Sequence, residues 1–130
     1  MKFYQREARG ATLKGIITCG ARVGYEDGRE FDLEETISFL NEINRERSER
    51  GAMTLPCIIK EGTLIGRSTD SDYREQVYQL EFSWSPRYKE IPRDTFREAL
   101  LAYADELGQR MEQQRMYIEF DGETTVLKKP

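Results

Sequence analysis

The residues best suited to chemistry in this sequence are its arginines. Of its 20 basic residues, 14 are arginine, whose guanidinium group binds carboxylate or phosphate through two parallel hydrogen bonds. The candidates for binding an anionic ligand combine arginines with side chains that donate hydrogen bonds. They are Arg22, Tyr25, Arg29, Arg67, Ser68, Thr69 and Arg110. These residues can act together only if the fold brings them to one place.

Several kinds of site are disfavoured. The chain has no histidine, and histidine is central to most catalytic triads, zinc sites and proton shuttles. No glycine-rich phosphate loop and no nucleophile-elbow serine occur. The carboxylates around Asp70 to Asp72 and Glu119 to Glu123 have ligands suited to Mg²⁺ or Ca²⁺, but turns and solvated charge explain them better. We therefore expect no catalytic residues, no metal and no cofactor.

Composition and charge narrow the class of protein. The net charge is −4 and like charges never form a long run, which argues against nucleic-acid binding. The charged residues Arg6 and Glu7 occur before any apolar run as long as that of a signal peptide, so no export signal is expected. The uncharged run from Gly15 to Ala21 is far shorter than the roughly 20 residues that span a bilayer. We expect a single domain over residues 1–130, no membrane and a cytoplasmic location.

The first half of the chain predicts a strand followed by a helix. Residues 12–24 alternate between apolar and other side chains, which is typical of a half-buried strand. Asp32 and Glu35 form a capping-box pattern that begins a helix, and Gly51 ends it.

The second half predicts strands on either side of another helix. Residues 53–67 are rich in strand formers but contain Pro56 and Gly62, so they form either one bulged edge strand, which we favour, or a hairpin. Residues 73–85 alternate as a strand. The helix extends from about Pro92 to Leu107 with Gly108 ending it, and its apolar face (Phe96, Leu100, Tyr103, Leu107) should pack on the sheet. Strands 115–120 and 124–127 then flank a hairpin turn.

This order of elements predicts an α+β protein of the ferredoxin-like, split β-α-β kind. Its β-α-β-β-α-β arrangement places both helices on one face of an antiparallel sheet, with an extra C-terminal hairpin strand. In this topology Cys19 and Cys57 lie on strands separated by another strand, so we expect both thiols to be reduced and mostly buried.

Three segments resemble small uncharacterised bacterial and phage proteins. They are GARVG at 20–24, DLEETISFLNEI at 32–43, and ELGQ followed by QRMYIEF near the C-terminal end. The resemblance implies the same ferredoxin-like fold and allows a phage origin, and it brings no known activity.

The topology is expected to gather the loops 24–32, 68–72 and 108–114 at one end of the sheet. If residues 53–67 are one strand, Arg22, Arg67 and Arg110 meet there and bind an anionic ligand. The alternative is that these arginines pair with neighbouring carboxylates such as Glu26, Asp27, Asp70 and Asp72.

Our first functional hypothesis is a non-catalytic binding protein and homo-oligomer that holds a small anionic or nucleotide-like ligand at this arginine-rich end. If the chain is phage-encoded, capture of a host signalling nucleotide would be a concrete form of it. The second is a protein-interaction or inhibitor module that uses the open sheet face or the edge strand. The third is an enzyme that uses Glu81 or Glu119 with Arg22.

Overall fold

The computed structural model describes residues 3–23 and 28–130. These form five strands and two helices along the chain. The elements are β1 (Leu13–Gly20), α1 (Leu33–Glu49), β2 (Cys57–Arg67), β3 (Asp72–Trp84), α2 (Arg93–Arg110), β4 (Arg115–Phe120) and β5 (Glu123–Lys128).

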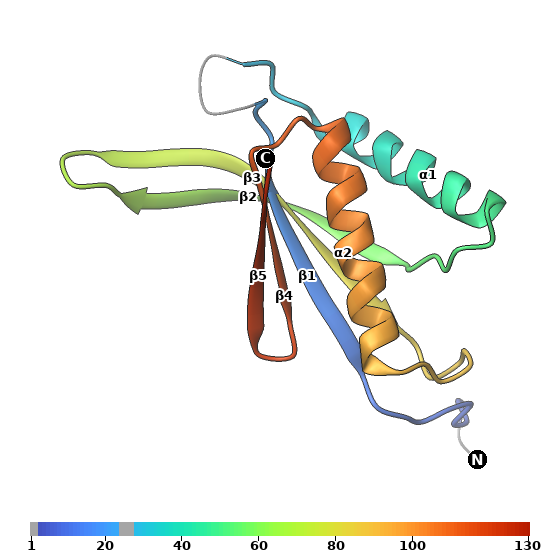
Figure 1. Cartoon of the computed structure of the whole chain (residues 1–130). Coiled ribbons are helices and arrows are strands. Elements are labelled where there is room, and N and C mark those ends of the chain that lie inside the picture. Colours follow the sequence, from blue (N-terminus) through green and yellow to red (C-terminus); the bar gives the residue numbers. More distant parts are fainter. Residues whose placement is uncertain (1–2, 24–27) are drawn as a thin grey trace.

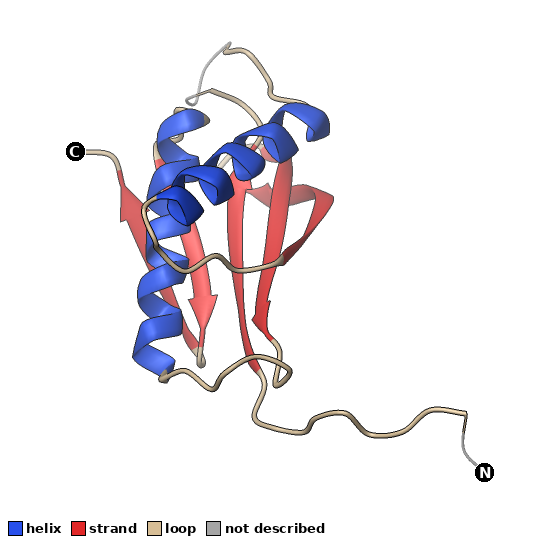
Figure 2. Cartoon of the chain, turned by 90° about the vertical axis from the view of Figure 1, so that its right-hand side faces the viewer, coloured by secondary structure: helices blue, strands red, loops and turns tan. Residues whose placement is uncertain are grey.

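The strands form one sheet in the order β2-β3-β1-β4-β5, and every neighbouring pair is antiparallel. Both helices lie on the same face of this sheet, and the other face is left uncovered (Figure 2). The order of the first four strands is that of the predicted ferredoxin-like arrangement, so the predicted fold class is confirmed. The added β5 follows a two-residue turn at Asp121 and Gly122, which take φ angles of 55° and 79° as such hairpin turns require.

The core lies between α2 and the centre of the sheet. Phe96, Leu100, Tyr103 and Leu107 are all buried, as the spacing predicts. Tyr103 packs on Phe82 of β3 with ring centroids 4.8 Å apart, and Phe96 packs on Phe120 of β4 at 5.2 Å.

Helix α1 begins and ends as predicted. The Asp32 side chain accepts a hydrogen bond from the Glu35 backbone N–H at 2.8 Å, and the Glu35 carboxylate accepts one from the Asp32 N–H at 3.2 Å. The capping box therefore satisfies backbone donors that the helix itself leaves free. After the helix, Gly51 takes a φ of +73°, which glycine adopts without strain.

Helix α2 continues beyond the predicted end at Gly108 and reaches Arg110. Gly108 sits inside the helix, where a Cβ atom would lie 2.9 Å from Cγ of Met116. The glycine at this position therefore allows α2 to approach β4 closely and does not end the helix.

Residues 57–67 form a single strand, so no hairpin occurs at Glu61 and Gly62. The predicted edge position is confirmed, but the predicted bulge is wrong, since β2 and β3 pair in an unbroken register from Cys57 with Phe82 to Arg67 with Asp72. The strand begins only after Pro56, which lacks the N–H that a sheet ladder uses.

Strand β1 ends at Gly20, four residues before the predicted end. Gly20 pairs with Val77, which also pairs with Gly62 of β2. Beyond this rung the β2–β3 hairpin has no third strand beside it and projects away from the sheet (Figure 1). We call residues 63–76 the arm.

The two cysteines are free. Cys19 is buried and Cys57 is half-buried, and burial raises the pKa of Cys19 to about 12 and that of Cys57 to about 11. Neither helix in the described part of the chain has the length and apolar character that crossing a membrane requires.

Candidate functional site

Three of the predicted site residues lie at the tip of the arm. Arg67 is the last residue of β2, five residues beyond the rung where β1 ends. At about 3.3 Å per residue this places it roughly 17 Å from that end of β1. Its guanidinium is 2.7 Å from the Asp72 carboxylate, and Ser68 bonds to Ser71 across the turn that also contains Thr69.

Two other predicted site residues, Arg22 and Arg29, lie between the end of β1 and the start of α1. The Arg22 guanidinium is 3.8 Å from the Glu30 carboxylate. Arg29 pairs with Glu35 and lies over the Phe31 ring, 4.9 Å from its centroid. Tyr25 lies outside the described residues.

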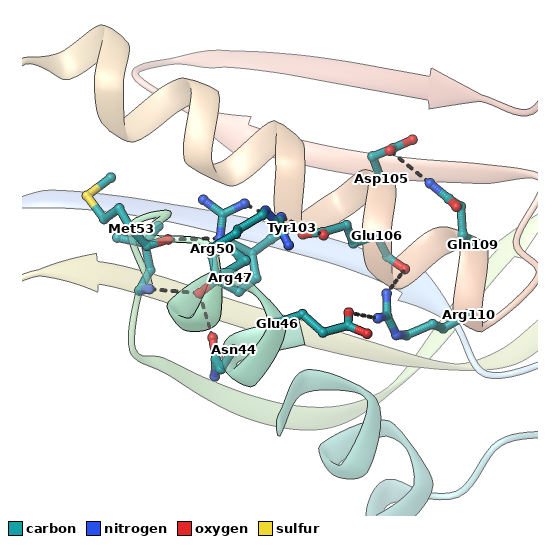
Figure 3. A network of polar contacts seen from close by, with 11 residues as sticks. Asn44, Glu46, Arg47, Arg50, Met53, Tyr103, Asp105, Glu106, Gln109 and Arg110 are labelled. Atoms are coloured by element: carbon teal, nitrogen blue, oxygen red, sulfur yellow. Dashed lines mark hydrogen bonds and ion pairs between the residues drawn. The ribbon is translucent and has the colours of Figure 1, made fainter. Parts of the chain in front are cut away.

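Arg110 lies in the helix layer, where it ties α2 to α1 (Figure 3). It pairs with Glu46 and lies 3.8 Å from the carboxylate of Glu42. Its guanidinium therefore faces α1.

The structure does not bring Arg22, Arg67 and Arg110 together. Each of the four predicted arginines has a carboxylate partner, although the partners differ from those proposed from sequence except at Asp72. The physical reason is the length of the arm, which carries the 68–71 turn far beyond the other loops. That these residues bind a ligand stays a prediction.

Charged side chains do gather where the arm leaves the sheet. A pocket of about 430 Å³ lies there, which we call the arm-base pocket. This volume is within the range of roughly 300–1,000 Å³ that small-molecule sites occupy. Its lining residues are Arg22, Glu30, Glu61, Gly62, Thr63, Arg74, Glu75 and Gln76.

The strand register places four of these side chains on the face that carries Tyr78. Glu61 pairs with Tyr78, Thr63 with Gln76, and Ile65 with Arg74. Directly paired residues and residues two apart share one face of a sheet. Glu61, Thr63, Gln76 and Arg74 therefore follow one another along the same side of the β2–β3 hairpin, from the base of the arm outward.

The wall opposite the arm is held by backbone hydrogen bonds. Phe31 N–H donates to the Ala21 carbonyl and Val23 N–H to the Arg29 carbonyl, both at 2.8 Å. This short ladder sets Arg22 beside Glu30. On its far side, the Gln113 side chain donates to the Arg22 carbonyl at 2.7 Å.

Tyr78 joins this wall to the arm. The side chain is fully buried, and its hydroxyl donates to the Phe31 carbonyl at 2.7 Å. Burial, with a smaller effect from the charge of Glu61, raises the pKa of Tyr78. The hydroxyl therefore stays protonated and keeps its role as donor.

The charges in the arm-base pocket are only partly balanced. Arg22 and Glu30 pair with each other, but no ion pair within the described part of the chain involves Glu61, Glu75 or Arg74. The pocket can thus hold a ligand that carries both a positive and a negative group.

Sequence reasoning found only Arg22 of this set. Glu61, Thr63, Arg74 and Gln76 each lie at alternate positions of a strand, so the sequence does indicate which of them share a face within one strand. The sequence does not predict that Glu61 pairs with Tyr78. A shift of two residues in the register between β2 and β3 would move Glu61 and Thr63 away from Gln76 and Arg74.

A second pocket lies at the other end of the molecule. It measures about 530 Å³ and contains Arg9, Tyr88, Glu90 and Arg93. Arg93 is 3.6 Å from the Asp121 carboxylate, and Glu90 is the pocket's single acidic residue. The arm-base pocket offers more carboxylates, so it is the better candidate for a ligand with a positive group.

Comparison with known proteins gives a fold-level likeness. No family model and no curated protein sequence matches the chain. Among solved structures, a phage SAM lyase in complex with S-methyl-5'-thioadenosine has a TM-score of 0.64 and 14% sequence identity, over 97% of this chain and 96% of that one. A phage SAM lyase in the apo state gives a TM-score of 0.62 at 14% identity, over 98% and 97% of the two chains.

These neighbours overturn our first functional hypothesis. The proteins that this chain resembles over almost its whole length are enzymes. They contradict the prediction of a non-catalytic binding protein and the preference for a protein without enzymatic activity. One neighbour holds a small nucleoside ligand. At 14% identity the likeness establishes a shared ferredoxin-like fold for this chain.

Proposed function

We propose that this chain is an enzyme that cleaves S-adenosylmethionine (SAM). The observation that carries the proposal is the likeness to phage SAM lyase over 97% of this chain and 96% of the other. One fold can serve many functions, so the residues of the arm-base pocket must also suit the substrate.

The ligand of the neighbour indicates which bond is cleaved. S-methyl-5'-thioadenosine is the part of SAM that remains when the bond between the sulfonium sulfur and the γ-carbon of the methionine side chain breaks. The electron pair of that bond stays on sulfur, so a neutral thioether leaves without needing a proton.

The remaining four-carbon fragment can close on itself. Its own carboxylate oxygen forms a bond to the γ-carbon while the sulfur–carbon bond breaks, which yields homoserine lactone. Neither water nor proton transfer is required. This reaction suits a chain that has no histidine, because it needs positioning of the substrate more than general acid–base catalysis.

Glu61 is the residue we assign to the sulfonium group. Its carboxylate lines the pocket and has no ion-pair partner within the described part of the chain. The positive charge on sulfur is strongest in bound SAM and fades as the bond breaks. Glu61 therefore contributes more to substrate binding than to the transition state.

The test is to incubate purified protein with SAM and follow the products by mass spectrometry. We expect S-methyl-5'-thioadenosine and homoserine lactone in equal amounts. Absence of the thioether would refute the proposal, and homoserine as the initial product would indicate a hydrolase.

Changing Glu61 to Gln should raise KM for SAM about tenfold or more, the scale of a lost charge-assisted contact, with a smaller effect on kcat. Glu98→Gln is the matched control. Glu98 is exposed on α2, so this variant should keep the wild-type KM. An equal effect in both variants would argue against Glu61 as a substrate contact.

We also propose that the enzyme is a homo-oligomer in the cytoplasm, as expected from sequence. The uncovered sheet face carries Ile58, Tyr117 and Val126, which are 58%, 43% and 48% exposed. The arm-base pocket is open to solvent on one side, since Glu61, Thr63 and Arg74 are exposed, and a second copy would help to exclude water from it. Native mass spectrometry tests this, and a monomer at micromolar concentration would contradict it.

A further inference from the structure

Arg74 differs from the other arginines of the candidate site in having no carboxylate partner. Its side chain has no ion pair or hydrogen bond within the described part of the chain, whereas Arg22 pairs with Glu30. It lies on β3 and lines the arm-base pocket. Its guanidinium is thus available to a ligand.

Arg74 and Glu61 lie at a defined spacing on one face of the β2–β3 hairpin. Glu61 pairs with Tyr78, which is four residues from Arg74 along β3. At about 3.3 Å per residue the two positions are roughly 13 Å apart. Side chains in a sheet stand roughly perpendicular to it, so the two charged groups are separated by a similar distance.

The methionine tail of SAM fits this spacing once a contact of about 3–4 Å is allowed at each of its charged ends. Four single bonds of about 1.5 Å separate its sulfonium sulfur from its carboxyl carbon. A carboxylate beside the sulfonium and a guanidinium beside the α-carboxylate would therefore hold the tail extended along the strand. The opposite charges of the two ends match the opposite charges of Glu61 and Arg74.

The rung between these two residues carries polar side chains. Thr63 pairs with Gln76 midway between the rung of Glu61 and that of Arg74, and both line the pocket. The Thr63 hydroxyl and the Gln76 carbonyl can accept hydrogen bonds from an ammonium group. The sequence of groups along the β2–β3 hairpin thus matches the sulfonium, amino and carboxylate groups of the tail.

We infer that Arg74 binds the α-carboxylate of the substrate and that the enzyme selects sulfonium nucleosides with an intact amino-acid tail. This inference rests on the proposed function and extends it to substrate selection. Arg74 would also fix the direction from which the carboxylate oxygen approaches the γ-carbon.

The experiment measures KM for SAM from initial rates of cleavage, and the inhibition constants of decarboxylated SAM and S-methyl-5'-thioadenosine against that reaction, for wild-type protein, Arg74→Ala and Arg74→Gln. In wild type, KM for SAM should lie below the inhibition constant of decarboxylated SAM. Both variants should raise KM for SAM by about 10-fold to 100-fold, as expected for the loss of a charged hydrogen-bonded pair. The inhibition constants of the two ligands without a carboxylate should stay within about twofold of their wild-type values.

The control is Arg87→Ala, which removes an exposed arginine that pairs with Glu7, and it should change none of the three constants. Equal increases for all three ligands in the Arg74 variants, or no increase for SAM, would overturn the inference while leaving SAM cleavage by the wild type intact. Wild-type protein that does not cleave SAM would overturn the proposed function as well.

Discussion

Replacing Tyr103 with Phe should destabilise the protein, because one hydroxyl connects three parts of the fold (Figure 3). The side chain is fully buried in α2. Its hydroxyl accepts a hydrogen bond from the Leu55 N–H at 2.8 Å and donates one to Asn44 Oδ1 at 2.6 Å. It thus joins α2 to α1 and to the segment that leads into β2.

The expected cost follows from what the substitution leaves unpaired. Phenylalanine keeps the ring, so the packing on Phe82 and the contact with the Arg47 guanidinium, 4.9 Å from the ring centroid, are retained. Leu55 is 2% exposed, so its N–H loses its acceptor where water has little access. An unsatisfied buried donor costs about 1–3 kcal/mol and the second lost hydrogen bond about 1 kcal/mol more.

The free energy of unfolding should therefore fall by about 2–4 kcal/mol, measured by urea denaturation followed by circular dichroism. With an unfolding entropy of about 2.1 cal/mol/K per residue, this corresponds to a Tm lower by about 7–15 °C. Tyr117→Phe is the matched control, because Tyr117 is 43% exposed, and it should change stability by less than about 0.5 kcal/mol. A similarly small change for Tyr103→Phe would refute the view that this hydroxyl holds the three segments together.

Three further predictions concern the fold. Gly15→Ala should lower the free energy of unfolding, measured by urea denaturation, by about 1–3 kcal/mol, because a Cβ atom at this position would lie 2.3 Å from Cδ1 of Leu100. Unchanged stability would mean that α2 can shift away from β1 at little cost. Asp32→Ala should lower the free energy of unfolding by about 0.5–2 kcal/mol, and Asp32→Asn should lower it much less, because asparagine can also cap the helix. Equal losses in the two variants would argue against the capping box. Burial raises the pKa of Cys19 to about 12 and that of Cys57 to about 11, so both should react slowly with a thiol reagent at pH 8 unless urea is present. Because the folded state holds these protons more tightly than the unfolded chain, their contribution to stability is complete below pH 9, the ordinary thiol value, and is lost as the pH rises through about 11 to 12.

Much of the fold could be predicted from local signals. The capping box at Asp32 and the apolar face of α2 depend on residues close in sequence, and both were read correctly. The prediction that Gly108 ends α2 is wrong, because the sequence does not distinguish a glycine that ends a helix from one that lets a strand pack closely against it. The packing of Met116 against it distinguishes the two cases.

The candidate site was harder to predict because it depends on the lengths of the strands. Nothing local to Gly20 indicates that β1 ends there while β2 and β3 continue. The sequence therefore placed Arg67 beside Arg22, whereas the arm separates them.

The preference for a non-catalytic protein over an enzyme rested on the absence of histidine and of a nucleophile motif. That argument holds for reactions that need a proton shuttle. In the proposed reaction the leaving group is a neutral thioether and the nucleophile is already a carboxylate. The lack of histidine therefore does not count against it.

The most direct test of the proposed function is the rate at which purified protein releases S-methyl-5'-thioadenosine from SAM, measured for wild type and Glu61→Gln over a range of SAM concentrations. We predict a wild-type rate proportional to protein concentration. The variant should be slower than wild type at low SAM, by a smaller factor than the rise in KM, and should equal or exceed wild type at saturation, because Glu61 stabilises bound SAM more than the transition state. No release by the wild type, or a variant rate equal to wild type at every concentration, would contradict cleavage of SAM at the arm-base pocket.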